Sequence, residues 1–197
     1  MREKVVKTEV TVQDGEIHNV TPDMLDWWWV NMEKGYMLWS LDHKKFEWEV
    51  PPTNNTPIGA IQYHEQGPGP IRKMRTLYVD PNTLPQSVKD YIIYEHVLVL
   101  GGLRPDNTIH FYGTEQYEAT SYGTSYRTTG HPQEDMPPHP LALTKHIQGE
   151  VARWSEFLPE LYKMWQFVKD PTINRQCCCK VRKVGSSIKY IERPNNS

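Results

Sequence analysis

The feature that most constrains this chain is a long amphipathic run over residues 141–169. Its apolar side chains recur at the three- and four-residue spacing of an α-helix. They are Ile147, Val151, Trp154, Leu158, Leu161 and Trp165. An apolar stripe of that kind must be covered by another layer of the protein. Pro159 predicts a kink, because proline lacks an amide donor. We therefore expect one long late helix that packs against the rest of the domain.

The residues before this run read mainly as β-strands. An early helix is expected to start at Thr21, a hydroxyl cap that precedes a proline and an acid, and to continue through three tryptophans to about Lys34. The order of elements predicts an α+β domain with an antiparallel sheet wrapped around the terminal helix. All 197 residues are expected to form one domain, with a core over about 4–170 and a tail over 171–197. Strands are expected over residues 4–12, 46–50, 58–65, 71–79 and 91–100, with one or two more within 108–126.

Composition excludes several classes of partner. The formal net charge is -2 and the isoelectric point is about 6.4, so neither nucleic acid nor an anionic membrane surface is an expected partner. No apolar run approaches the ~20 residues that span a bilayer. The first residues do not resemble a secretory leader, and a cytoplasmic protein is expected.

The three cysteines are adjacent, at Cys177, Cys178 and Cys179. An odd number in one place is not a disulfide framework, and the spacing is not that of a zinc site. We expect these residues to act as small apolar side chains of a strand near the C-terminus.

His146 and Glu150 carry the clearest chemical signal. A spacing of four on a helix puts both side chains on one face, about one turn apart. Glu150 falls within the apolar stripe and His146 lies at its edge. A carboxylate that faces a core is costly unless it is paired or bound to a metal. The pattern indicates a metal site, with an ordinary polar pair as the alternative.

Two further residues could complete that site. His43 lies between Trp39 and Trp48, and the alternative for it is a core or turn histidine. Glu65 closes a strand beside a Gly/Pro turn, and the alternative is a solvated strand end. Two histidines and two carboxylates suit one zinc ion per chain, and non-haem iron also accepts such ligands. The combination predicts an enzyme.

The other histidines are less specific. His96 is either packed in the core or a pocket acid/base. His64 is expected on the opposite side of the sheet from Glu65, because successive strand residues alternate. His110 is expected on a strand face. The loop predicted over 129–140 is a candidate lid, and its His131 and His139 are expected to be solvated.

Several segments resemble a known enzyme family. The tryptophan-rich stretch 24–29, followed by 36–43 with its closing Asp-His, resembles the zinc-dependent carbon–carbon hydrolases that include diacetylphloroglucinol hydrolase and phloretin hydrolase. The helical His-x-x-x-Glu at 146–150, followed by the Leu-Pro-rich stretch 157–162, also resembles that family. A strand that bears a Glu before a Gly-rich turn, over 62–67, is a looser match. The resemblance covers about 24–165.

The resemblance implies a Bet v 1-like helix-grip fold, zinc, and hydrolysis of an acyl group attached to a phenolic ring. Carried over residue by residue, it implies His43, Glu65, His146 and Glu150 as the zinc ligands. The implied partner is a small aromatic ketone. A homodimer is left open.

The resemblance also suggests three assisting residues: His96, Tyr112 and Tyr36. Cleavage of an aryl–acyl bond by water is a retro-Claisen reaction, in which the ring is protonated at carbon and becomes a β-diketone tautomer. We expect His96 to shuttle that proton and the tyrosines to orient phenolic hydroxyls. Where the family has an asparagine after Asp-His, this chain has Lys45 or Phe46, which leaves the substrate open.

Two alternatives remain at this stage. The chain has 7 Trp and 11 Tyr, a surplus that would equally serve a metal-free helix-grip carrier of an aromatic or hydrophobic small molecule. The same pocket could also support a cyclase, an isomerase or an oxygenase. Metal content separates the carrier from the enzymes, and product analysis separates the enzymes from one another.

Overall fold

The computed structural model of the protein describes residues 10–53, 56–67, 70–132, 141–185 and 187–191. Its centre is a seven-stranded antiparallel sheet with the strand order β1-β7-β6-β5-β4-β3-β2. Strands β2 to β7 form a meander, and β1 joins it beside β7. The strands are β1 (Thr11–His18), β2 (His43–Val50), β3 (Ile61–Gln66), β4 (Arg72–Tyr78), β5 (His96–Leu103), β6 (Ile109–Ala119) and β7 (Gly123–Pro132).

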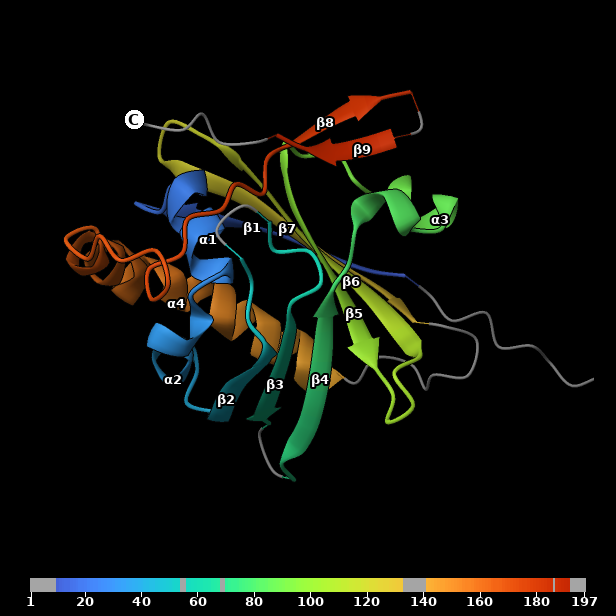
Figure 1. Ribbon diagram of the computed structural model, residues 1–197, viewed down its shortest axis with the longest axis horizontal. Helices are drawn as coiled ribbons and strands as arrows, with labels where there is room; N and C mark the ends of the chain where they lie inside the picture. Colours follow the sequence, from blue (N-terminus) through green and yellow to red (C-terminus); the bar gives the residue numbers. More distant parts are fainter. Residues whose placement is uncertain (1–9, 54–55, 68–69, 133–140, 186, 192–197) are drawn as a thin grey trace, which may run out of the picture.

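The helices gather mainly on one face of this sheet. The long helix α4 (Leu141–Trp165) lies across that face, with α1 (Pro22–Trp29) and α2 (Tyr36–Trp39) beside it (Figure 1). A hairpin of β8 (Val181–Val184) and β9 (Ser187–Tyr190) lies near α3 (Gln86–Lys89), and 3-10 turns occupy Met32–Lys34 and Pro81–Thr83. Among the helices in the described ranges, none is long and apolar enough to cross a membrane.

The expected architecture is confirmed: an antiparallel sheet holds a long late helix. The early helix begins where predicted, because the Thr21 side chain accepts a hydrogen bond from the Met24 amide and Pro22 occupies the first turn. It ends at Trp29, and a short 3-10 turn carries the chain on to Lys34. Pro159 lies inside α4 without ending it.

Several predicted boundaries were wrong. Strand β1 covers Thr11–His18, where the prediction was 4–12, of which 4–9 lie outside the described residues. Strand β5 starts at His96, since residues 91–95 complete the turn after α3. Residues 129–132 extend β7 and do not open a loop, whereas 133–140, the remainder of the candidate lid, are not described.

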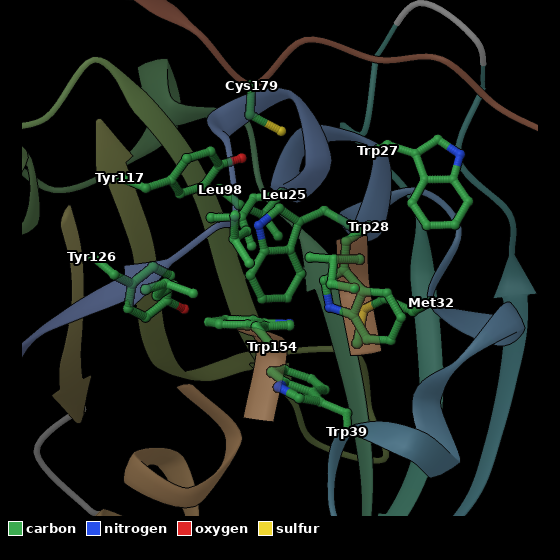
Figure 2. Close-up of a cluster of buried hydrophobic side chains, with 14 of the residues drawn as sticks. Leu25, Trp27, Trp28, Met32, Trp39, Leu98, Tyr117, Tyr126, Trp154 and Cys179 are labelled. Atoms are coloured by element: carbon green, nitrogen blue, oxygen red, sulfur yellow. The ribbon is translucent and has the colours of Figure 1, made fainter. Parts of the chain in front are cut away.

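A cluster of tryptophans joins α4 to the other helices and to the sheet. Trp154 stacks on Trp39 at a ring-centroid distance of 5.1 Å and meets Trp29 edge-on at 5.7 Å. Tyr126 of β7 meets the same indole edge-on at 4.9 Å. Figure 2 shows Trp154 between Trp39 and Tyr126 at the centre of this core. Because the cluster includes the middle of α4, it holds the whole helix in place against the sheet.

Replacing Trp154 with alanine should therefore lower the free energy of unfolding by about 3–5 kcal/mol, because it removes a large, fully buried side chain of α4. Urea unfolding followed by circular dichroism measures the loss. Met164→Ala, at an exposed position on the same helix, is the control and should change stability by less than about 0.5 kcal/mol. Equal effects of the two substitutions would contradict this description of the core.

Candidate metal centre and cavity

Three predicted ligands from two elements meet inside the protein: His43 at the start of β2, and His146 and Glu150 on α4. The Nε2 atom of His43 lies 2.7 Å from Oε1 of Glu150, and Nε2 of His146 lies 3.1 Å from the same oxygen. One ligand atom from each residue lies within 4.8 Å of the other two, and all three residues are buried. Two imidazoles and one carboxylate are a common ligand set for zinc and for non-haem iron.

Tyr36 orients the His43 ring. Nδ1 of His43 lies 2.6 Å from the Tyr36 carbonyl oxygen, and the two rings stack at 3.8 Å with only 6° between their planes. A hydrogen bond at Nδ1 leaves Nε2 free to face Glu150. The Tyr36 hydroxyl donates to Oε1 of Gln66 at 2.7 Å, which fixes the tyrosine in turn. The Trp39 indole N–H donates to the Glu150 carbonyl at 3.0 Å.

His146 is held less completely. Its Nδ1 lies 3.4 Å from Oδ2 of Asp42, and its Nε2 approaches Glu150. Neither contact has hydrogen-bond geometry, so both nitrogens of this buried ring lack a hydrogen-bond partner among the residues described. A buried polar atom without a partner is rare, and a bound ion is one explanation for it. The residues present therefore fit a divalent metal.

Charge within the group of three is partly balanced. Burial lowers the pKa of His146, but its contacts with Glu150 and Asp42 outweigh burial and the net pKa is raised. Burial raises the pKa of Glu150, but the two imidazoles outweigh burial and the net pKa is lowered. Both directions favour an ionised Glu150 carboxylate.

A cavity of about 700 Å³ adjoins this group, between α4 and the sheet. Trp29, Trp39 and Tyr36 provide aromatic surface, and Glu150 reaches the cavity wall. The size is that of a site for a small organic ligand, with apolar walls and a few polar groups.

The structure does not bring Glu65 to this group. On β3, His64 and Gln66 line the cavity, so alternation directs Glu65 to the other face. There the Tyr63 hydroxyl donates to the Glu65 carboxylate at 2.5 Å, and Lys73 is its cross-strand neighbour. The predicted alternation between His64 and Glu65 is confirmed, but it is His64 that faces the cavity.

His64 is a cavity residue that the sequence analysis missed. It is buried, and its Nδ1 has no hydrogen-bond partner in the described part of the chain. Burial lowers the pKa of His64 to about 4, against the opposing effect of the Glu150 carboxylate. The ring is therefore neutral at pH 7 and has a nitrogen available to a ligand.

Glu115 on β6 was also missed. Burial raises the pKa of Glu115 to about 8, and the negative charge of Glu150 adds to that rise. Hydrogen bonds from Tyr126 and Thr128 act in the opposite direction. The carboxyl borders the cavity and is still largely protonated at pH 7. Strand alternation with Gly113 on the cavity face is the sequence signal that could have identified Glu115.

Two of the three predicted assisting residues lie elsewhere. His96 does not line the cavity: its Nδ1 lies 3.0 Å from Oδ1 of Asp26, which also accepts a hydrogen bond from Tyr117 at 2.8 Å. This matches the core-packed alternative for His96. Tyr112 packs on the opposite face of the sheet, in the apolar cluster that includes Val99 and Ile188. The structure places neither His96 nor Tyr112 at this cavity, because chain position alone does not define which face or end of a strand meets it.

Tyr36 does line the cavity, but its hydroxyl is bonded to Gln66. Burial, with the Glu150 charge, raises the pKa of Tyr36 above its ordinary value, so the hydroxyl stays protonated at neutral pH.

His131 is buried beside Thr129, contrary to the solvated position expected, and burial lowers the pKa of His131. His110 borders the cavity, and His139 lies outside the described residues.

Two of the three cysteines are buried as expected, but the predicted strand is not formed at these residues. Cys177 and Cys179 are buried, and the Cys179 carbonyl accepts the Val97 amide at 2.9 Å beside β5. These residues precede β8 and do not belong to the group of His43, His146 and Glu150.

Neither a protein-family model nor a curated protein sequence matches the chain. Solved structures do match. The solution structure of KanY protein (ms6282) is 8% identical with a TM-score of 0.51, covering 78% of this chain and 99% of that one. The di-domain ARO/CYC BexL from the BE-7585A biosynthetic pathway is 8% identical with a TM-score of 0.50, covering 75% of this chain and 49% of that one. At such identities the likeness shows the fold alone, which is Bet v 1-like helix-grip.

The raised pKa of Glu115 predicts a pH dependence of stability. Unfolded, this carboxyl loses its proton near pH 4.5, whereas folded it keeps the proton to about pH 8. Stability should therefore fall as pH rises through this interval, by at most about 1.4 kcal/mol per pH unit. Glu115→Gln removes the titrating group, so its stability relative to the wild type should increase from pH 5 to pH 8 and then level off. Urea unfolding at pH 5, 6, 7, 8 and 9 measures this.

Tyr126→Phe is the matched control for that series, because it removes a hydrogen bond to Glu115 and keeps the carboxyl. Its stability should still fall with pH as in the wild type. A Glu115→Gln variant whose advantage does not change with pH would contradict a protonated carboxyl at this position.

Proposed function

We propose that the protein is a metal-dependent enzyme that hydrolyses the carbon–carbon bond between an acyl group and a phenolic ring of a small aromatic ketone. The observation that carries this proposal is the group of His43, His146 and Glu150, buried at the wall of an aromatic-lined cavity with an imidazole that lacks hydrogen-bond partners. The resemblance of the segments 24–43 and 146–162 to the carbon–carbon hydrolases supports the same reaction.

His43, His146 and Glu150 would hold the ion, and Glu65 would not. A bound zinc or iron ion would polarise a ketone carbonyl and lower the pKa of a water molecule. Tyr36 contacts Nδ1 of His43, and Asp42 contacts Nδ1 of His146. These contacts would orient the two imidazoles, as residues that bind the second nitrogen of a metal-binding histidine usually do.

The chain also has a proton donor for the ring. In the hydrolysis, the oxygen of water bonds to the acyl carbon, the aryl–acyl bond breaks, and the ring carbon takes a proton. Glu115 is largely protonated at pH 7 and borders the same cavity, so it can donate that proton. The neutral His64 ring, with its free nitrogen, can accept a proton from water or from a phenolic hydroxyl. This pair takes the role that the sequence analysis gave to His96.

A second candidate is a metal-free activity, either ring closure or ligand transport. The fold likeness to a di-domain described as ARO/CYC favours it, and Glu115 and His64 could act as acid and base without an ion. The two candidates differ in their products. Hydrolysis releases a carboxylic acid, whereas cyclisation and transport do not.

Elemental analysis of the purified protein tests the first candidate. We expect about one zinc or iron ion per chain, because the described residues contain one such three-residue group. His146→Ala should lose both the ion and the release of carboxylic acid from an acylated phloroglucinol, followed by chromatography.

Glu65→Gln is the control, since it removes a carboxylate on the opposite face of β3. It should keep the metal content of the wild type. No metal in the wild type, or full metal content in His146→Ala, would refute the metal site and favour the metal-free alternative. Metal without acid release would refute the hydrolysis alone.

A further inference from the structure

Three residues lie in one row across neighbouring strands, and two of them, Gln66 and Arg72, border the cavity. His43 of β2 is paired in register with Gln66 of β3, and Gln66 is paired with Arg72 of β4. Adjacent strands are about 4.8 Å apart, so the backbone positions of His43 and Arg72 are separated by about 10 Å. That is roughly the span of one aromatic ring with a substituent at each end. The row therefore runs from His43, a candidate metal ligand, to a cation that borders the cavity.

Arg72 differs from the cations next to it. It is the first residue of β4, it is exposed, and it borders the cavity. Among the described residues, no acidic side chain pairs with its guanidinium. The cavity lining also includes Lys73 and Arg75, but the register pairs these two with Glu65 and Tyr63, on the other face of the sheet. There Arg75 binds Glu49 through several hydrogen bonds. Arg72 thus presents an unneutralised positive charge to a ligand in the cavity.

The negative charge inside the cavity does not cancel this cation. Glu115 is largely protonated at pH 7, and Glu150 lies between two imidazoles. Arginine offers a planar fork of donors that matches a carboxylate in two-point hydrogen bonding.

We propose that Arg72 determines substrate specificity by binding a carboxylate, so that the substrate is an aromatic acid whose ketone carbonyl lies toward His43, His146 and Glu150. The inference rests on the proposed function for the place of the carbonyl. The binding of the carboxylate by Arg72 requires only the cavity and the register of the three strands.

Binding of a matched pair of probes tests this. 2-Naphthoate and 2-naphthamide share one ring system and differ in charge, and quenching of the cavity tryptophans Trp29 and Trp39 reports their binding. We expect the wild type to bind naphthoate about 10-fold more tightly, as a charge-assisted hydrogen bond at a partly exposed site allows. Arg72→Gln should remove this preference. Lys73→Gln, which deletes the adjacent charge on the opposite face, should keep it within about 2-fold.

The series is run on the protein as purified and after treatment with a chelator. A preference that persists without metal and disappears in Arg72→Gln supports the proposal, whatever the metal analysis shows. Three results would overturn it: equal binding of the two probes by the wild type, an unchanged preference in Arg72→Gln, or a preference that chelation abolishes. The first two results would not bear on whether His146 holds a metal, and the third would mean that a bound metal, not Arg72, binds the carboxylate. Failure here is therefore distinct from failure of the proposed function.

Discussion

The site depends on one buried carboxylate, Glu150, and on the two imidazoles that contact it. A carboxylate inside a protein is costly unless it is paired, and His43 at 2.7 Å and His146 at 3.1 Å provide that pairing. The pairing joins α4 to the first residue of β2, two elements more than 90 residues apart in the chain. The pairing depends on the cluster around Trp154, which lies one helical turn from Glu150. This cluster holds α4 with its Glu150 face toward the sheet.

The cavity holds two carboxyl groups in different states. Glu150 lies between two imidazoles and stays ionised, whereas Glu115 accepts hydrogen bonds from the hydroxyls of Tyr126 and Thr128 and is largely protonated at pH 7. Such a separation of pKa values within one pocket is how a protein provides an anion and an acid at the same pH. The ionised Glu150 carboxylate is suited to bind a metal cation, and the protonated Glu115 carboxyl is suited to protonate a developing carbanion. The two groups come from α4 and from β6, so the helix-grip fold itself separates their roles.

The site residues that could be predicted from the sequence are those on α4, where the helical period defines which side chains share a face. His146 and Glu150 were recognised from their spacing within an apolar stripe, and His43 from its aromatic neighbours. Strand residues were harder, because a shift of one position reverses the face of the sheet. On β3 the sequence favours Glu65 as a metal ligand, whereas it is the neighbouring His64 that faces the cavity. His96 and Tyr112 were assigned without knowledge of which end and face of β5 and β6 meet the cavity, and Glu115 was missed in a segment that reads only as rich in Thr and Tyr.

X-ray absorption spectroscopy of the zinc-loaded protein tests the central claim most directly, because it distinguishes sulfur ligands from oxygen or nitrogen ligands and detects bound imidazole rings. If His43, His146 and Glu150 hold the ion, the spectrum should show two imidazoles, further oxygen ligands and no sulfur. Sulfur scattering would place the ion at Cys177–Cys179, and zinc without bound imidazole would place it away from both histidines. Either result would contradict the account.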